Sequence, residues 1–201
     1  MKKNTLLLIL VTVTSSATAQ ETQLPGSKIG ISFLGLGSND AVHLTDLDGA
    51  AWYTGEGYYG FQLDYIKPIN KVFSFESGIG FRHHELNQHP NVPPGEDESP
   101  NPAFTDILVV PVGVRVNFLK YAFINTGILI DTSLGHSTNI SAQNGIGFNL
   151  GMGLQYEFNF GLGVFVNPYA AMHSAVHLSA ENYPERSTES GLKIGVTYLL
   201  R

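Results

Sequence analysis

The stretch Asn144–Phe158, NGIGFNLGMGLQYEF, alternates between two kinds of residue at every step. The first kind is large and apolar: Ile146, Phe148, Leu150, Met152, Leu154, Tyr156 and Phe158. The second kind is glycine or polar: Gly145, Gly147, Asn149, Gly151, Gly153, Gln155 and Glu157. Because successive side chains of a β-strand point to opposite faces, this alternation predicts a strand. It leaves open which face is the inside of the protein.

Seven further segments of the chain show the same alternation. Their apolar residues begin at Ile29, Tyr59, Phe73, Leu108, Ala122, Phe160 and Leu192. Each segment is about as long as a tilted strand that crosses a bilayer. Short connections alternate with long ones. The long connections lie at roughly 35–57, 84–104, 132–143 and 171–189. Outer-membrane barrels have this pattern, with their short turns facing the periplasm. We therefore predict an all-β fold, an eight-stranded antiparallel up-and-down transmembrane β-barrel with long extracellular loops.

The glycine and polar residues of these segments fit the interior of a narrow barrel. An eight-stranded barrel is just wide enough to be filled by side chains, so glycines leave space for long polar residues. Buried charges require partners, which predicts ion pairs across the lumen and a plugged interior. The predicted lumen network consists of Lys28, Asp64, Glu76, Arg82, Arg115, Asp131, Glu157 and Lys193. The apolar residues then face lipid.

Pro111 interrupts the fourth segment. Proline has no amide hydrogen, and a closed barrel uses every donor of its ladder. A bulge or a local gap in the ladder is expected there.

The chain is acidic and begins with the pattern of a secretory signal peptide. It has 201 residues, a net charge of −6 and no cysteine, which fits one domain without disulfides. Lys2 and Lys3 precede an apolar run and an Ala-x-Ala site that ends at Ala19. We expect a signal peptide over residues 1–19, which is removed, and a barrel domain over residues 20–201. An acidic exported chain is a poor nucleic-acid binder, so no such partner is expected.

With its strands placed in this way, the chain resembles the outer-membrane β-barrel domain family typical of Bacteroidetes, called PorT-like or porin-family proteins. The resemblance rests on the signal peptide ending at Ala19, on the strand Asp106–Arg115 with its interior proline, and on the last strand. It implies a protein of the Gram-negative cell envelope, located in the outer membrane after secretion across the inner membrane. A fold family implies scarcely any specific activity.

The last strand, KIGVTYLL from Lys193 to Leu200, is similar to the terminal signal that barrel-assembly machinery recognises. Lys193 and Gly195 supply the polar residue and the glycine of that signal, and Tyr198 and Leu200 supply its alternating hydrophobic residues. The resemblance implies the assembly machinery as a partner during insertion, and outer-membrane lipid as the surroundings of the folded chain.

All seven histidines map to the long-loop end of the predicted barrel. Histidine is the commonest metal ligand, so a zinc, copper or haem site between loops is an alternative. Spacing alone specifies no metal, and solvated loop histidines are the preferred interpretation. We therefore expect no metal and no cofactor. The alternative metal ligands are His83, His84, His89, His136, His173 and His177, with His43 the seventh histidine.

No catalytic residue is expected in this chain. Some small outer-membrane barrels are lipid-modifying hydrolases, and His136-Ser137 and His173-Ser174 are the candidates for such chemistry. Neighbours in a strand point to opposite faces, so only a pairing across strands fits a hydrolase. The glycine doublets do not open a helix and so are no dinucleotide fingerprint. The acidic run Glu96–Glu98 is interpreted as a solvated loop and not as a calcium site.

The favoured function is a non-enzymatic, monomeric outer-membrane barrel with a filled polar lumen. It acts structurally, or it presents its extracellular loops to a surface or periplasmic protein that is not identified. Two alternatives keep the barrel: an accessory component of a secretion or motility apparatus, and a small passive porin. A third alternative inverts the faces, because a soluble lipocalin-like barrel would bury Ile146, Phe148 and Leu150 around an apolar ligand.

Overall fold

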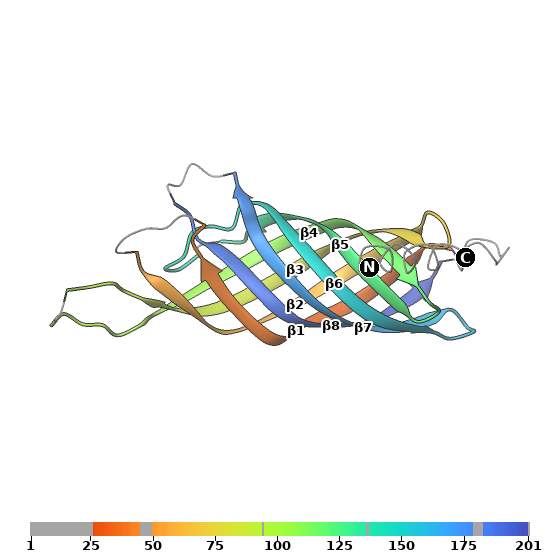
Figure 1. The fold of residues 1–201 in the computed structure, drawn as a ribbon, viewed down its shortest axis with the longest axis horizontal. Helices are drawn as coiled ribbons and strands as arrows, with labels where there is room; N and C mark the ends of the chain where they lie inside the picture. The colour runs from red at the N-terminus through yellow and green to blue at the C-terminus, as the bar shows by residue number, and fades with distance from the viewer. Residues whose placement is uncertain (1–25, 45–49, 94, 136, 179–182, 201) are drawn as a thin grey trace, which may run out of the picture.

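The computed structural model describes residues 26–44, 50–93, 95–135, 137–178 and 183–200, which form a closed antiparallel barrel (Figure 1). The eight strands are β1 Lys28–Val42, β2 Trp52–Pro68, β3 Phe73–His89, β4 Asn101–Phe118, β5 Ala122–Ser133, β6 Gly145–Glu157, β7 Leu162–His177 and β8 Arg186–Leu199. Each strand pairs with the next one along the chain, and β8 pairs with β1 to close the ring. The predicted fold is confirmed. The predicted signal peptide, residues 1–19, lies outside the described residues.

In β6 the apolar residues face outward. Phe148, Leu150 and Met152 expose 49%, 60% and 61% of their surface. Gly147 and Gly151, on the opposite face, are buried in the barrel. The lipocalin-like alternative required the reverse arrangement and is therefore wrong. Within the described residues, no helix has the length and apolar character needed to cross a membrane.

Glycine is required on the inner face of β6 because neighbouring strands send long side chains into the same space. A Cβ atom at Gly151 would lie 2.6 Å from the amide oxygen of Asn167 and 2.7 Å from that of Asn125. A Cβ atom at Gly153 would overlap the ring of Phe123. The small residues of the opening stretch thus make room for the interior of the barrel.

Several strands extend into the regions predicted as long loops. β3 continues to His89 and β4 begins at Asn101, so both ends of the predicted loop 84–104 are strand (Figure 1). β2, β3 and β4 have 17, 17 and 18 residues, whereas a tilted strand needs about 9–11 residues to cross a bilayer. Polar residues continue the ladder here because backbone hydrogen bonds do not depend on side-chain polarity. The bounds predicted for the loops 35–57, 84–104 and 171–189 were therefore too wide, whereas the loop predicted at 132–143 lies at 134–144.

Two irregularities shape the interior. Beside Pro111 the pairing of β3 with β4 stops after Ser77↔Val112 and resumes at Gly80↔Val109 in the same register, which is the expected gap and not a bulge. In β7 the register against β6 shifts by two residues, and Ser174 has a φ of 45°, in the left-handed region. This bulge leaves both His173 and Ser174 fully buried, although they are neighbours in one strand.

Candidate functional site

The lumen is occupied by polar and charged side chains that meet across the barrel. At the short-turn end, Lys28 of β1 forms an ion pair with Glu157 of β6. Lys193 of β8 reaches Asp64 of β2, with 2.6 Å between Nζ and Oδ1. These pairs join strands that are not neighbours in the ring. They therefore cross the lumen and do not run along its wall.

Asp64 is the best satisfied of the lumen carboxylates. It accepts hydrogen bonds from the Ser32 hydroxyl, the Gln62 amide and the Lys193 ammonium, each at 2.6 Å. A buried carboxylate with this set of donors remains charged without the full desolvation cost. Asp64 is 8% exposed and thus has little contact with solvent.

Arg115 of β4 is also buried in the lumen. Its guanidinium forms an ion pair with Glu76 and donates a hydrogen bond to Gln155 at 2.9 Å. Its Cζ atom lies 3.8 Å from the ring centroid of Phe123, within the range of a cation–π contact. Arg115 therefore fills space and neutralises the charge of Glu76 in the half of the barrel nearer the short turns.

Arg82 holds a corresponding position nearer the long-loop end. Its Nε atom lies 3.3 Å from Oε1 of Glu189, and its Nη2 donates to Gln62 at 2.8 Å. Side chains leave little space at this level: the lumen cavity beside Arg82 and Glu189 has a volume of about 40 Å³, room for a few water molecules. Arg82 was predicted from the sequence, but its partner Glu189 was not.

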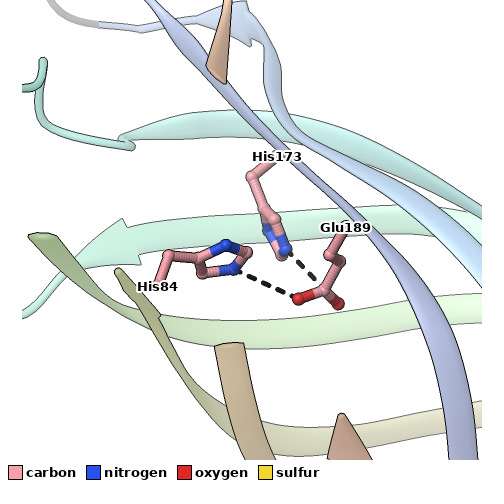
Figure 2. A group of neighbouring side chains, drawn as sticks. All are labelled: His84, His173 and Glu189. Atoms are coloured by element: carbon pink, nitrogen blue, oxygen red, sulfur yellow. Dashed lines mark ion pairs between the residues drawn. The ribbon is translucent and has the colours of Figure 1, made fainter. Parts of the chain in front are cut away.

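Glu189 belongs to a fully buried cluster with His84 and His173 (Figure 2). Nε2 of His84 lies 3.1 Å from Oε2 of Glu189, and Nε2 of His173 lies 3.7 Å from Oε1. His173 also meets Asp131, with 3.0 Å between Nδ1 and Oδ1. Neither histidine has exposed surface. The interpretation of His84 and His173 as solvated loop residues was wrong, because β3 and β7 extend far enough to turn both side chains into the lumen.

The other described histidines lie apart from this cluster. His83 points to the opposite face of β3 and meets Asp106 at 2.6 Å. His89 stacks on Trp52, with 3.8 Å between ring centroids, and His177 contacts the carbonyl of Ala142 at 2.7 Å. These strand residues also depart from the loop interpretation. His136 lies outside the described residues.

A small apolar cluster covers the polar lumen at the long-loop end. It consists of Ala41, Tyr53, Leu86, Ala103 and Ile140. Ile140 comes from the β5–β6 connection, and the neighbouring Gln143 is fully buried, where its amide binds the carbonyls of Ser141 and Glu185 at 2.9 and 3.0 Å. We call this arrangement the cap. It lies at the long-loop end of the barrel, beyond the histidine cluster.

Glu185 fixes the β5–β6 connection to the start of β8. Burial alone would raise the pKa of this carboxyl, but hydrogen bonds from the Ser141 hydroxyl, the Ser141 amide and the Tyr53 hydroxyl outweigh burial and lower the pKa below its usual value. Glu185 is therefore a charged anchor of the cap at neutral pH.

Of the hydrolase candidates, His173 and Ser174 do not form a serine–histidine pair, and His136 lies outside the described residues. The Ser174 hydroxyl has no hydrogen-bond partner, and the ring of His173 is directed to Asp131 and Glu189. Ser137 shares a hydrogen bond of 3.0 Å with Thr105. Among the residues that the structure describes, no serine hydroxyl is hydrogen-bonded to a histidine ring, the contact that would activate a nucleophile.

The sequence contains a signal for the inward position of His84, His173 and Glu189, of which only Glu189 was absent from the predicted candidates. In β3 the inward residues Arg82 and His84 share one parity, and in β8 the inward Lys193 and Glu189 do the same. In each strand the inward parity continues past the end of the predicted alternation and places His84, His173 and Glu189 inside. The polar ends of the strands concealed this continuation.

Comparison with known proteins was made at the levels of sequence and structure. No family model matches the chain, and no curated protein matches it in sequence. Among solved structures, it is similar to the outer membrane protein OprG from Pseudomonas aeruginosa, with 11% identity, a TM-score of 0.54 and coverage of 89% of this chain and 98% of OprG. It is also similar to the outer membrane protein AlkL, with 10% identity, a TM-score of 0.52 and coverage of 91% and 94%. At such low identity, these likenesses show that the chain has the fold of these outer-membrane barrels.

Proposed function

We propose that this chain is a non-enzymatic, monomeric outer-membrane barrel of the Gram-negative envelope that presents its extracellular end to a protein partner. Its exposed apolar side chains, such as Leu150 and Met152, suit a lipid environment and would be costly in water. The structural similarity to outer-membrane barrels supports this location. The finer assignment to PorT-like proteins remains part of the proposal.

The observation that carries the proposal is the filled lumen. Ion pairs such as Arg82–Glu189 and Lys193–Asp64 cross it, and the buried apolar residues of the cap lie above them. Opening a pore would require these charges to separate while still largely buried, which is strongly unfavourable. A filled barrel is a rigid support and not a conduit, so its accessible function lies at its ends.

The long-loop end has the features of a presented surface. β2, β3 and β4 continue beyond the length that a bilayer requires, and the β3–β4 hairpin projects furthest (Figure 1). Trp52, 56% exposed, stacks on His89 at the base of this extension. Exposed aromatic residues held rigidly in this way are common anchors of protein–protein contacts.

Insertion by the barrel-assembly machinery is part of the same proposal. β8 closes the barrel against β1, and its outward residues include Tyr198, which is 53% exposed. With Lys193, Gly195 and Leu200, this residue makes up the terminal pattern proposed as the assembly signal.

Two measurements test the proposal. Purified barrel in a planar lipid bilayer should give no steady conductance, whereas reproducible ohmic steps would favour the passive porin. Membrane fractionation, with gels of unboiled and boiled samples, should show outer-membrane residence and a heat-dependent mobility shift. Recovery from the soluble periplasm would contradict the proposed location.

Site-specific photo-crosslinking in cells distinguishes the kinds of partner. A crosslinker at Trp52 should capture protein, and one at the lipid-facing Leu150 serves as the matched control that captures none. A third crosslinker at Leu119, 85% exposed in the short turn between β4 and β5, reports on the periplasm. Protein captured from Leu119 and not from Trp52 would favour an accessory of a periplasm-spanning apparatus.

A further inference from the structure

We propose that His84, His173 and Glu189 form a binding site for a divalent transition-metal ion of the zinc class inside the barrel. The three side chains come from β3, β7 and β8, and their candidate ligand atoms all lie within 4.8 Å of one another (Figure 2). Two imidazoles and one carboxylate are a known ligand set for Zn²⁺, with a fourth position left for water.

The atoms that face the centre of this cluster have no hydrogen-bond partner. They include Nε2 of His84, Nε2 of His173 and Oε2 of Glu189, all buried. His84 Nε2 and Glu189 Oε2 approach to 3.1 Å without hydrogen-bond geometry. Two ligands of one tetrahedral Zn²⁺, at bond lengths of about 2.0–2.1 Å, lie roughly 3.4 Å apart. The arrangement is thus close to that of atoms converging on one ion, and buried polar atoms rarely remain unpaired without such a reason.

Groups behind two of the three ligands, His173 and Glu189, already hold them in orientations suited to a metal. Nδ1 of His173 meets Asp131 at 3.0 Å, which leaves Nε2 free as a ligand. Asp131 is itself fixed by the amide of Ser174 at 2.8 Å, a contact created by the bulge in β7. A carboxylate behind a ligating histidine is the usual outer-shell arrangement of zinc sites.

Glu189 is oriented in the same manner. Its Oε1 accepts hydrogen bonds from the Tyr169 hydroxyl at 2.9 Å and from Arg82 Nε at 3.3 Å. Its Oε2 is left facing His84 and the centre of the cluster. Oε1 of Glu189 therefore binds protein donors, and Oε2 is available as a ligand of the ion.

The charge of the cluster also favours a cation. Two carboxylates, Asp131 and Glu189, contact its histidines, and Arg82, which pairs with Glu189, is the one guanidinium in contact with either carboxylate among the described residues. When both imidazoles are neutral, as metal ligation requires, the two carboxylates exceed the guanidinium by one negative charge. This charge is enclosed, because Glu189 is 3% exposed and both histidines are 0% exposed. A bound ion would connect β3 to β7 and β8 across the lumen, and so would strengthen the interior beneath the cap.

Metal binding by the folded full-length barrel in detergent tests the inference. Equilibrium dialysis against micromolar Zn²⁺ should leave about one ion per chain, measured by atomic emission. Titration with Co²⁺ should give the intense visible bands of a four-coordinate ion. The heat-dependent gel shift verifies that each sample is folded. No Zn²⁺ binding tighter than roughly 10⁻⁴ M by the folded protein, far weaker than structural zinc sites, would overturn the inference.

Matched variants locate the ion. His84→Gln and Glu189→Gln should abolish stoichiometric Zn²⁺ retention and the Co²⁺ bands, and Asp131→Asn should weaken binding by about 10- to 100-fold through His173. His83→Gln, the next residue on the outer face of β3, should bind as the wild type does. Full binding by folded His84→Gln, or loss of binding in His83→Gln alone, would assign the ion to surface histidines and contradict the lumen site. If a glutamine variant fails to fold, EXAFS of the Co²⁺-loaded wild-type protein tests the site instead. The spectrum should show two imidazole ligands on the ion, and a ligand shell without two imidazoles would exclude the site.

Discussion

Arg82 of β3 and Glu189 of β8 form an ion pair across the lumen, with 3.3 Å between Nε and Oε1. The two strands are not neighbours in the barrel, and both side chains are almost fully buried. The pair therefore connects distant walls at the level where the polar interior meets the histidine cluster. Its strength depends on both members, because a buried charge without a partner is far more costly than a buried pair.

Removing Arg82 should destabilise the barrel strongly. Arg82→Ala leaves Glu189 without its guanidinium, and breaking a buried pair in this way typically costs about 3–5 kcal/mol. Reversible urea unfolding in lipid vesicles measures the change. Lys120→Ala, in an exposed turn, is the control and should change the free energy of unfolding by about 0.5 kcal/mol or less. Equal effects of both substitutions would show that Arg82 does not hold the lumen together.

A charge on the outer face of β6 tests the face assignment. Leu150→Arg places an arginine near the middle of the lipid-facing strand and should cost about 2–4 kcal/mol. Leu178→Arg, just past the end of β7, should cost about 0–1 kcal/mol, since it lies near or beyond the interface. The same unfolding assay measures the change in the free energy of unfolding for both variants. A negligible cost at Leu150 would mean that this face does not contact lipid.

The inner face of β6 should reject large residues. Gly153→Leu would overlap the ring of Phe123 and the backbone of Val166, and overpacking of this kind costs about 1–3 kcal/mol. Met152→Leu, its lipid-facing neighbour, conserves volume and should have an effect of about 0.5 kcal/mol or less. If the leucine at 153 were tolerated as well as the one at 152, the lumen could not be filled as described.

Acid should loosen the cap. The hydrogen bonds from Ser141 and Tyr53 lower the pKa of Glu185 below its usual 4.5, despite partial burial, which raises it. A carboxyl whose pKa is depressed by folding contributes stability that is present above about pH 4.5 and is lost as the pH falls through the lower, folded value. Hydrogen exchange should therefore show a falling protection factor at the Ser141 amide as the pH is lowered below 4.5. Glu185→Gln, which does not titrate, should abolish this dependence on pH, and an unchanged profile in the variant would assign the effect to another group.

The outer face was predictable because its rule is local. Side chains alternate along a strand, so Phe148 and Leu150 share one face and Gly147 and Gly151 the other, whatever the rest of the chain does. Lumen residues within the alternating segments, such as Lys28, Asp64 and Arg115, followed from the same rule. The apolar face was assigned to lipid because the other face combines glycine with polar residues. That combination fits the narrow interior of a small barrel.

The cluster of His84, His173 and Glu189 was not predicted because the ends of the strands are polar. There the apolar half of the alternation fades while the backbone ladder continues, so the sequence read as loop where the structure has strand. His84 and Glu189 also lie far apart in the chain, and only the register of the closed barrel brings them to 3.1 Å. Which side chains meet across a lumen depends on the registers of all the intervening strand pairs together.

The sequence by itself determined the strand order, the lipid-facing side and most of the charged residues of the lumen, because each depends on the local alternation of side chains. The tertiary structure alone decided which side chains contact each other across the lumen. Closing the ring placed Arg82 beside Glu189, and the bulge in β7 turned both His173 and the amide of Ser174 toward Asp131. Such contacts follow from the relative stagger of distant strands and from the two-residue register shift in β7, neither of which a side-chain alternation records.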